Sequence, residues 1–400
     1  MTIATSTWPP QILGIGRCFS AALRGEDLSV LSRPILARID SAPPAAADLL
    51  DLSILLMLSN LAEDGLRVQG LALAMEQVYR VRPPGGDLRL LMFVGPGPLM
   101  ANVPIYFLLE GSGISLDLVH LLPGQPLPAD LPEHDLAVVG LGEADEARPM
   151  LKFLEAQLAG WPKPVFLDPG RIPLLARDRI HLELAGAPGV NMPATARIPL
   201  AEALRLARGE EALAAILPGS QWPILVRPVG SHAGKGLMKV DDAAALLAYL
   251  EADGAEMLYL TPFVNYASPD GLFRKYRITL IQGQPYAIHM AAGSHWMLHY
   301  LNAGMNEDAA KRANEAHWFA TFDETFAPRH AAAFQAIHQR LGLDFVTLDC
   351  AETPEGDLLI FEADTAMIIH DLDPPELYPY KSPQMRKVFK AFQDMLRRLA

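Results

Sequence analysis

Short apolar runs that end in glycine or a loop dominate residues 88–167, and they constrain the fold more than any other feature. Helix-like stretches separate several of these runs. Strands that alternate with helices form parallel sheets, whose ligands gather at the carboxyl ends of the strands. The expected order is strand 88–94, helix 105–110, strand 114–121, strand 135–140, helix 145–158 and strand 165–167.

Residues 1–85 have a different pattern, with helical periodicity and little strand signal. Apolar residues recur at helical spacing across 53–69, and 71–79 continue in helix-forming residue types. The Arg-Pro-Pro-Gly-Gly sequence at 82–86 then breaks the pattern and marks a domain boundary. We therefore expect a helical N-terminal region at 1–85 and a parallel-sheet α/β domain at 86–170.

From about residue 171 the chain alternates hairpin strands with helices, which is typical of an α+β domain. The chain as a whole thus combines α/β and α+β regions, and its 400 residues are enough for two or three domains. The expected elements are strands 224–226, 236–240, 276–281, 285–290, 345–350 and 358–362, and helices 241–251 and 384–399.

Composition excludes several function classes. The formal net charge is -13, whereas nucleic acids and anionic membranes bind cationic surfaces, so neither is an expected partner. Two cysteines, Cys18 and Cys350, are too few for a disulfide framework or a cysteine-rich zinc site. The apolar stretch at 49–58 is shorter than the ~20 residues of a membrane helix, and no secretory signal pattern begins the chain. A cytoplasmic protein is expected.

A glycine-bearing loop at 230–236 follows an expected strand. Small residues let backbone N–H groups approach phosphate oxygens, and serine and lysine side chains add donors. The loop is not a Walker loop, because its lysine precedes a glycine and a strand instead of Ser/Thr and a helix. A plain hairpin turn with surface charge is the alternative. The candidate phosphate-binding residues are Arg227, Gly230, Ser231, Gly234, Lys235 and Gly236.

Three carboxylates end two expected strands near the C-terminus. Asp349 ends one strand, and Glu362 and Asp364 end the next. Residues two apart on a strand point to the same face, so Glu362 and Asp364 converge, and hairpin pairing sets Asp349 opposite them. Three carboxylates at one point repel each other unless a cation neutralises them, and oxygen-only ligands suit Mg²⁺. Solvated hairpin ends are the alternative, and the metal interpretation is favoured.

Two further segments carry candidate catalytic residues. Arg274, Lys275 and Arg277 lead into a strand on which Lys275 and Arg277 share a face. Cations there stabilise charge on transferred phosphoryl oxygens, or else they form a basic strand rim. The histidine- and aromatic-rich stretch at 295–302 is typical of a ligand-contacting loop. His299, or His295, within it is a candidate general base, with a structural hydrogen-bond donor as the alternative.

Taken in this order, the segments resemble the ATP-grasp superfamily, in particular its RimK and glutathione synthetase branch. The resemblance covers about 88–400 and includes the Leu-Ala-Arg-Asp step at 175–178 and the Pro-Ala-Thr strand at 193–195. It implies a pre-ATP-grasp domain followed by an ATP-grasp domain at 171–400, in which two α+β subdomains clamp ATP. The flap subdomain would cover about 195–262.

The resemblance also implies roles for single residues. The two positions at which the family holds ATP with lysine correspond to Arg179, or Arg177, and to Arg227. Arginine keeps the charge and adds bidentate geometry. The carboxylates match the family's Asp…Glu-x-Asn metal triad, with Asp364 in place of the asparagine.

The adenine-contacting hinge of the family corresponds to 256–264, so Leu260 and Phe263 are candidates there. The implied reaction uses ATP and Mg²⁺ to activate a carboxylate as an acyl-phosphate, which an amine converts into an amide or peptide. The substrates would be small molecules, amino acids or peptides. Bacterial ATP-grasp proteins of poorly defined substrate share a narrower similarity. A phosphotransferase and a non-catalytic nucleotide-binding module are the alternatives, and the resemblance also allows a homodimer.

Overall fold

The computed structural model describes residues 8–83, 85–231 and 234–400, and the chain forms two compact units. The first unit combines Met1–Ile172 with Thr365–Ala400, and the second is Pro173–Asp364. The expected border near residue 170 lies close to one of these divisions. However, the chain's first 85 residues and its last 36 belong to the unit that holds the parallel sheet, which differs from the expected three regions.

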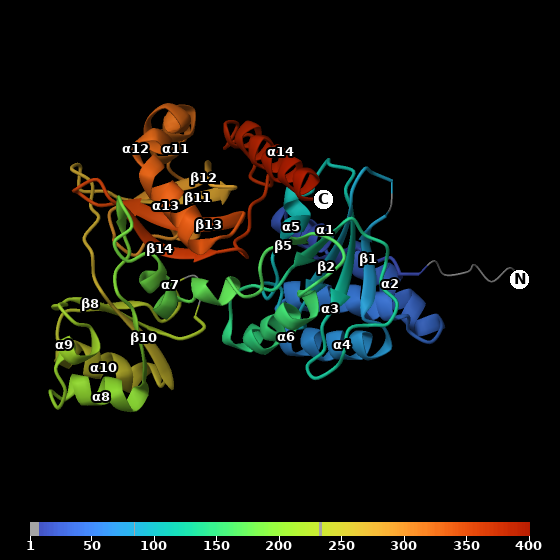
Figure 1. The fold of residues 1–400 in the computed structure, drawn as a ribbon, viewed down its shortest axis with the longest axis horizontal. Helices are drawn as coiled ribbons and strands as arrows, with labels where there is room; N and C mark the ends of the chain where they lie inside the picture. Colours follow the sequence, from blue (N-terminus) through green and yellow to red (C-terminus); the bar gives the residue numbers. More distant parts are fainter. Residues whose placement is uncertain (1–7, 84, 232–233) are drawn as a thin grey trace, which may run out of the picture. The chain divides into compact units, whose positions relative to one another are not determined.

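The first unit is built on a five-stranded sheet in the order β1-β3-β2-β4-β5 (Figure 1). Strands β2 to β5 pair in parallel, which confirms the α/β prediction, and β1 joins the edge antiparallel to β3. Strands β2 and β4 are almost entirely apolar and buried, whereas β3 also buries Ser115, Asp117 and His120. The bounds are β1 (Val78–Arg82), β2 (Arg89–Val94), β3 (Ser115–His120), β4 (Leu136–Val139) and β5 (Val165–Phe166).

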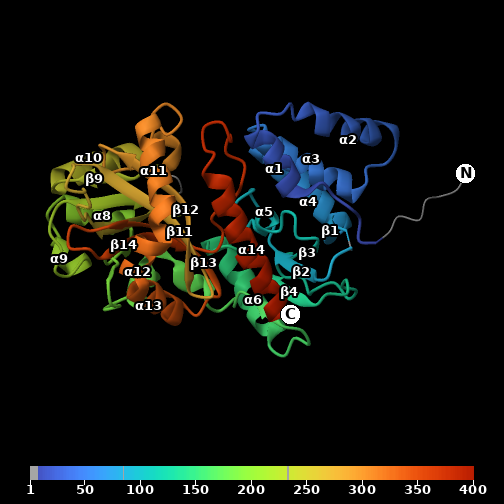
Figure 2. The ribbon, with the colours of Figure 1, turned by 90° about the horizontal axis from the view of Figure 1, so that it is seen from above.

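Helices surround this sheet (Figures 1 and 2). The C-terminal helix α14 packs Phe392 against Phe166 of β5, with ring centroids 5.7 Å apart, which explains why the end of the chain belongs to this unit. None of the helices in the described ranges is long and apolar enough to cross a bilayer. Their bounds are α1 (Gly14–Leu23), α2 (Ser29–Ser41), α3 (Ala46–Leu58), α4 (Ala62–Met75), α5 (Ile105–Leu108), α6 (Arg148–Leu158) and α14 (Lys381–Leu399).

The continuous helical pattern expected across 53–79 is wrong in two places. Asn60 has a φ of 63°, so the chain turns between α3 and α4; asparagine adopts this left-handed conformation more readily than most residues. Gly65 then allows α4 to lie close to α3, because a Cβ there would be 2.5 Å from Met57 Cγ. From Val78 the chain is a sheet edge instead of a helix.

A cavity of about 50 Å³ lies in the first unit between the N-terminal helices and the carboxyl ends of β2 and β3. Its walls are mostly apolar, and they include Ile54 of α3 and Leu118 of β3. His120 also lines it, with 6% of its surface exposed and its Nδ1 atom buried without a hydrogen-bond partner. Burial lowers the pKa of His120 to about 4, so this imidazole is neutral at pH 7.

Replacing His120 tests this burial. Because its pKa is lowered from 6.5 to about 4, the unfolded chain gains a proton that the folded chain does not. The stability that neutral His120 contributes is therefore present above pH 6.5 and is lost as the pH falls through 4. Between pH 6 and 4.5, the unfolding free energy should fall by about 1.4 kcal/mol per pH unit more in the wild type than in His120→Gln. Urea denaturation measures both slopes, and equal slopes would contradict the burial.

The second unit contains two sheets, which confirms the α+β prediction (Figure 1). One has the order β7-β10-β8-β9, and the other β12-β11-β13-β14-β6. All neighbours pair antiparallel except β14 and β6. The strands are β6 (Val190–Asn191), β7 (Ala196–Pro199), β8 (Ile224–Pro228), β9 (Met238–Val240), β10 (Met257–Pro262), β11 (Phe273–Ile281), β12 (Gln284–Gly293), β13 (Phe345–Glu352) and β14 (Leu358–Asp364). The helices of this unit include α7 (Arg177–Glu183), α8 (Leu200–Ala207), α9 (Leu213–Ile216), α10 (Ala243–Asp253), α11 (Ala309–Thr321), α12 (Ala327–Arg329) and α13 (Ala331–Leu341).

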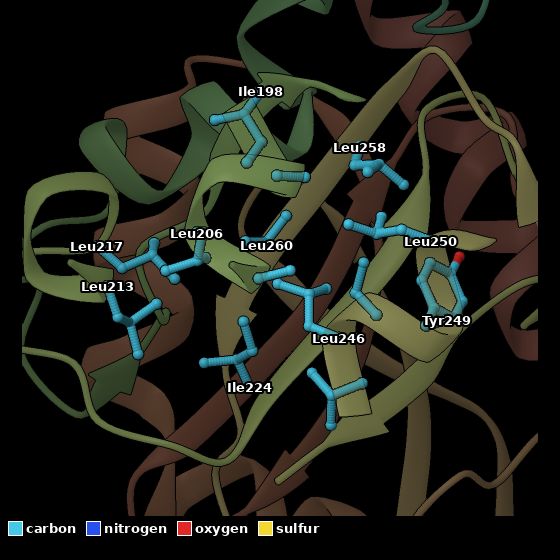
Figure 3. Close-up of a cluster of buried hydrophobic side chains, with 14 residues drawn as sticks. Ile198, Leu206, Leu213, Leu217, Ile224, Leu246, Tyr249, Leu250, Leu258 and Leu260 are labelled. Carbon is cyan, nitrogen blue, oxygen red and sulfur yellow. The ribbon is translucent and has the colours of Figure 1, made fainter. Parts of the chain in front are cut away.

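Helices α8, α9 and α10 supply side chains to an apolar core on the four-stranded sheet (Figure 3). Leu258 and Leu260 of β10 both belong to this core, and neither has any exposed surface. Strand alternation points Tyr259 and Thr261 to the opposite face. The side chain of Leu260 therefore packs inside the core, and the prediction that it contacts a nucleotide base is wrong for that side chain.

Truncation of Leu260 distinguishes a core residue from a ligand contact. Leu260→Ala should lower the free energy of unfolding by about 2–5 kcal/mol, because it leaves a cavity in a packed core. Met238→Ala is the control, since Met238 in the same sheet is 48% exposed and should change stability little. Chemical denaturation of both variants provides the comparison. Similar small losses in the two would place Leu260 outside the core.

Candidate functional site

In the second unit, the five-stranded sheet brings charged residues together on three neighbouring strands, β11, β13 and β14. In register, Arg277 of β11 lies opposite Asp349 of β13, and Asp349 lies opposite Glu362 of β14. The pairing of β13 with β14 is irregular just after Asp349, and that of β11 with β12 is irregular just after Arg277. Bulges change the direction of side chains, and both irregularities occur next to charged residues.

Asp349 is the buried centre of this charge cluster, with 3% of its surface exposed. Arg277 donates from Nε to Oδ1 over 2.7 Å and from its Nη2 to Oδ2 over 3.0 Å. Lys275 Nζ lies 2.7 Å from Oδ2. Burial by itself would raise the pKa of Asp349, but Arg277 and Lys275 hold it well below its usual range. The carboxylate is thus ionised and bound by two cations.

Arg274 does not join Lys275 and Arg277. Its guanidinium pairs with Asp270 over 2.6 Å, and it also approaches Asn314 Oδ1 at 3.4 Å. Because successive side chains on a strand point to opposite faces, Arg274 lies on the other side of β11. In this structure Arg274 therefore does not lie with Lys275 and Arg277, the other two basic residues that were predicted to be catalytic.

Glu362 is bound by an arginine from α7. Arg177, the first residue of that helix, places Nη2 2.6 Å from Glu362 Oε1 and donates from Nη1 to the Phe361 carbonyl oxygen over 3.0 Å. Burial would raise the pKa of Glu362, but Arg177, followed by Lys275, holds it below its usual value. Of the two arginines considered from the sequence, Arg177 reaches the carboxylates, whereas the side chain of Arg179 is exposed.

Asp364 lies two residues beyond Glu362 on β14 and opposite Thr347 in register. Burial lowers the pKa of Arg277, but Asp349, then Glu362 and Asp364, outweigh it and raise the pKa above its usual value, which places Asp364 near this arginine. Within the described ranges, no group of three or more His, Cys, Asp or Glu side chains is arranged to hold a metal ion. The expected triad is therefore not assembled here, because basic side chains neutralise Asp349 and Glu362 instead.

Arg227 of β8 stands near the same cluster and anchors the start of the glycine loop. It donates from Nε to Ser231 Oγ over 3.1 Å and from Nη2 to the Ser231 carbonyl oxygen. The Ser231 hydroxyl in turn donates to the Pro228 carbonyl oxygen over 2.8 Å. Burial and the charge of Arg177 lower the pKa of Arg227 to about 10, while Glu362 acts in the opposite direction.

The glycine loop has the backbone geometry that small residues permit. Gly230, Gly234 and Gly236 have φ values of 74°, 75° and 68°, which favour glycine. A Cβ at Gly234 would lie 3.8 Å from Met297 Sδ, and the side chain of Lys235 is exposed. Residues 232–233 of the predicted phosphate loop lie outside the described residues.

Phe263, the second hinge candidate, belongs to a partly exposed aromatic group. Its ring makes a T-shaped contact with Trp296 at 5.6 Å between centroids, and Lys239 Nζ lies 5.1 Å from its centroid. The Tyr266 hydroxyl donates to the Trp296 carbonyl oxygen and ties the 295–302 loop to the segment that follows β10. Lys239 is not among the residues predicted from the sequence, although its position on the strand after the glycine loop was a usable signal.

His299 lies within electrostatic reach of the charge cluster. Burial lowers its pKa, and the positive charges of Lys275 and Arg277 lower it further. Asp349 and Glu362 have the opposite effect. A histidine with a lowered pKa is neutral at pH 7 and able to accept a proton, as a general base must.

Comparisons with known proteins give similarity at the level of structure. No protein-family model matches the chain, and a comparison with curated proteins gave no significant match. The structure of a RimK-domain ATP-grasp protein from Sphaerobacter thermophilus is similar at 17% identity and a TM-score of 0.44, over 77% of this chain and 99% of that one.

Two ligase or synthetase structures are similar to a comparable extent. The VanG D-Ala:D-Ser ligase from Enterococcus faecalis has 16% identity and a TM-score of 0.47, over 79% of this chain and 99% of that one. The D-cycloserine synthetase DcsG has 15% identity and a TM-score of 0.44, over 77% and 99% respectively.

Replacing Asp349 tests its place at the centre of the cluster. Asp349→Asn should cost about 3 kcal/mol of unfolding free energy, because it leaves two largely buried cations without their partner. Asp270→Asn is a matched control that removes a carboxylate from the surface pair with Arg274, and it should have a much smaller effect. Chemical denaturation curves of the two variants give the unfolding free energies to be compared. Equal effects would remove Asp349 from its central role.

Proposed function

We propose that this chain is an ATP- and Mg²⁺-dependent ligase of the ATP-grasp type that joins a carboxylate to an amine through an acyl-phosphate. One observation carries the proposal: basic side chains from two strands, β8 and β11, and from helix α7 gather near three carboxylates of β13 and β14. The residues are Lys275, Arg277, Arg177 and Arg227 with Asp349, Glu362 and Asp364.

The charge balance of this cluster favours a polyanionic ligand. Four cations and three carboxylates leave one net positive charge, in a chain whose formal net charge is -13. Arginine forks match phosphate oxygens in a bidentate manner. Arg177 and Arg227 are close enough for Arg177 to lower the pKa of Arg227, and a phosphate bound by both would relieve this repulsion. The triphosphate of ATP fits such a site.

The carboxylates fit Mg²⁺ by their chemistry. Glu362 and Asp364 alternate on β14 and so point to one face, and Mg²⁺ is bound in proteins by one or two carboxylates together with phosphate oxygens and water. These two residues would hold the ion, with Asp349 close to Glu362 in register. When bound, the ion would supply charge neutralisation at the phosphates.

The proposed reaction has two steps. A carboxylate oxygen of the substrate attacks the γ-phosphorus of ATP, the bond to the ADP oxygen breaks, and an acyl-phosphate forms. An amine then attacks the acyl carbon, phosphate leaves, and the nitrogen loses a proton. Lys275 and Arg277 would stabilise negative charge that develops on the transferred group. The neutral imidazole of His299 would accept the proton.

An ADP-release assay over amino acids and small carboxylic acids, with amines added, tests the activity. We expect turnover that requires both substrates and a product whose mass equals carboxylate plus amine minus water. Glu362→Gln should lower turnover by about 100-fold or more, because it removes a negatively charged ligand of Mg²⁺. Glu251→Gln, an exposed change on α10, is the matched control and should be unaffected.

The product separates the proposal from its alternatives. A stable phosphorylated compound formed without an amine would indicate a phosphotransferase. ATP binding with turnover at background across all pools would indicate a non-catalytic nucleotide-binding module. Wild-type activity in Glu362→Gln would remove the metal assignment.

A further inference from the structure

We infer that Arg177 acts as an internal substitute for the metal: in the nucleotide-free protein it holds Glu362, and ATP must draw it away before a divalent cation binds there. Metal and nucleotide would then bind with strong positive coupling. This inference rests on the proposed function, because it concerns the order of binding at the same site.

The contacts of Arg177 are those of a side chain that occupies a cation position. One nitrogen of its guanidinium lies 2.6 Å from Glu362 Oε1, and another donates to the carbonyl oxygen of Phe361 over 3.0 Å. The fork thus binds a carboxylate and the preceding backbone oxygen together. A metal ion bound through either oxygen of Glu362 would lie close to the guanidinium that now contacts Oε1, and the two cations would repel each other strongly.

The neighbouring carboxylate offers no alternative site for the metal. Asp349 is already bound on both oxygens by Arg277 and Lys275. A divalent cation that approached the nucleotide-free cluster would therefore meet a net positive group in which Asp349 and Glu362 are already paired with basic side chains. This agrees with the finding that no three acidic or metal-ligating side chains of the described residues are arranged around a common point.

ATP changes this balance through the arginines. Arg177 and Arg227 lie close enough to repel each other, so a phosphate group between them gains from both. When Arg177 turns to the phosphate, the Glu362 oxygen becomes available, and the phosphate adds further oxygen ligands and negative charge. The coupling must be reciprocal, so the metal strengthens ATP binding by the same factor as ATP strengthens metal binding.

Binding of Mn²⁺ to the full-length protein, followed by the loss of its free electron paramagnetic resonance signal, tests the inference without turnover. The wild type should bind Mn²⁺ weakly alone and at least about tenfold more tightly with a non-hydrolysable ATP analogue. Arg177→Gln should bind Mn²⁺ at least about tenfold more tightly than the wild type in the absence of nucleotide, with a smaller further gain from the analogue. Arg177→Lys keeps the charge and should remain close to the wild type.

Two controls separate the ion pair from a general loss of positive charge. Arg227→Gln removes a nearby cation that has no contact with Glu362 in the structure, and it should strengthen nucleotide-free Mn²⁺ binding less than Arg177→Gln does. Arg208→Gln, an exposed change at the end of α8, should have no effect.

The outcomes are distinguishable. Equal Mn²⁺ affinity of the wild type with and without the analogue, or equal effects of Arg177→Gln and Arg227→Gln, would overturn the inference while leaving ATP binding intact. Failure of the analogue to bind the wild type would instead overturn the proposed function. Because the analogue itself chelates Mn²⁺, wild-type binding is compared with a protein-free titration of the same analogue. This corrected comparison needs no variant, so it decides the coupling even if Arg177→Gln does not fold.

Discussion

The ion pairs of Asp349 are the constraint on which the rest of the second unit depends. A buried carboxylate is tolerated when its charge is paired and its oxygens accept hydrogen bonds, and here Arg277 and Lys275 satisfy both oxygens. These bonds join β11 to β13, so a slip of one residue between the two strands would remove the partner of a buried charge. The requirement fixes the register of β11 against β13, and the pairing of β13 with β14 then sets Glu362 opposite Asp349.

The same strands carry an apolar face that holds the sheet in place. Tyr276 lies between Lys275 and Arg277 and points away from the cluster, where its ring packs 4.8 Å from that of Phe326 near α12. Cys350, next to Asp349, is fully buried. Alternation along each strand thus gives one face packed by aromatic residues and one face that carries charge. A rigid packed face allows the charged side chains to keep their positions on the other.

Strand alternation allowed much of this arrangement to be predicted from the sequence. It could not predict contacts that depend on how a helix is rotated against the sheet. Period-two spacing correctly indicates that Lys275 and Arg277 share a face, and the turn between β13 and β14 brings Asp349 close to Glu362. The choice between Arg177 and Arg179 depends on the rotation of a short helix, which no local pattern encodes. Leu260 could have been assigned correctly, because Leu258 and Leu260 repeat at the spacing of a buried strand face.

The domain borders show the same division between local and distant information. The Pro-Gly sequence at 82–86 is a true break in the chain, but it connects an edge strand to the central strand of one sheet instead of separating two domains. Nothing within a few residues of it indicates that β1 pairs with β3, or that α14 packs on β5, since both contacts join segments far apart in the sequence.

The carboxylates raise a more general point about inferring metal sites from sequence. Three acidic residues on adjacent strands do require a neutralising charge, but the chain can supply it from arginine and lysine as well as from a metal. Acidic spacing by itself therefore does not separate a metal site from an ion-pair network. The distinguishing property is the excess of basic groups: a structural network needs no more cations than carboxylates, whereas Arg227 brings this cluster to a positive balance. A surplus cation, partly desolvated beside a glycine loop, is what the proposed phosphate ligand would require.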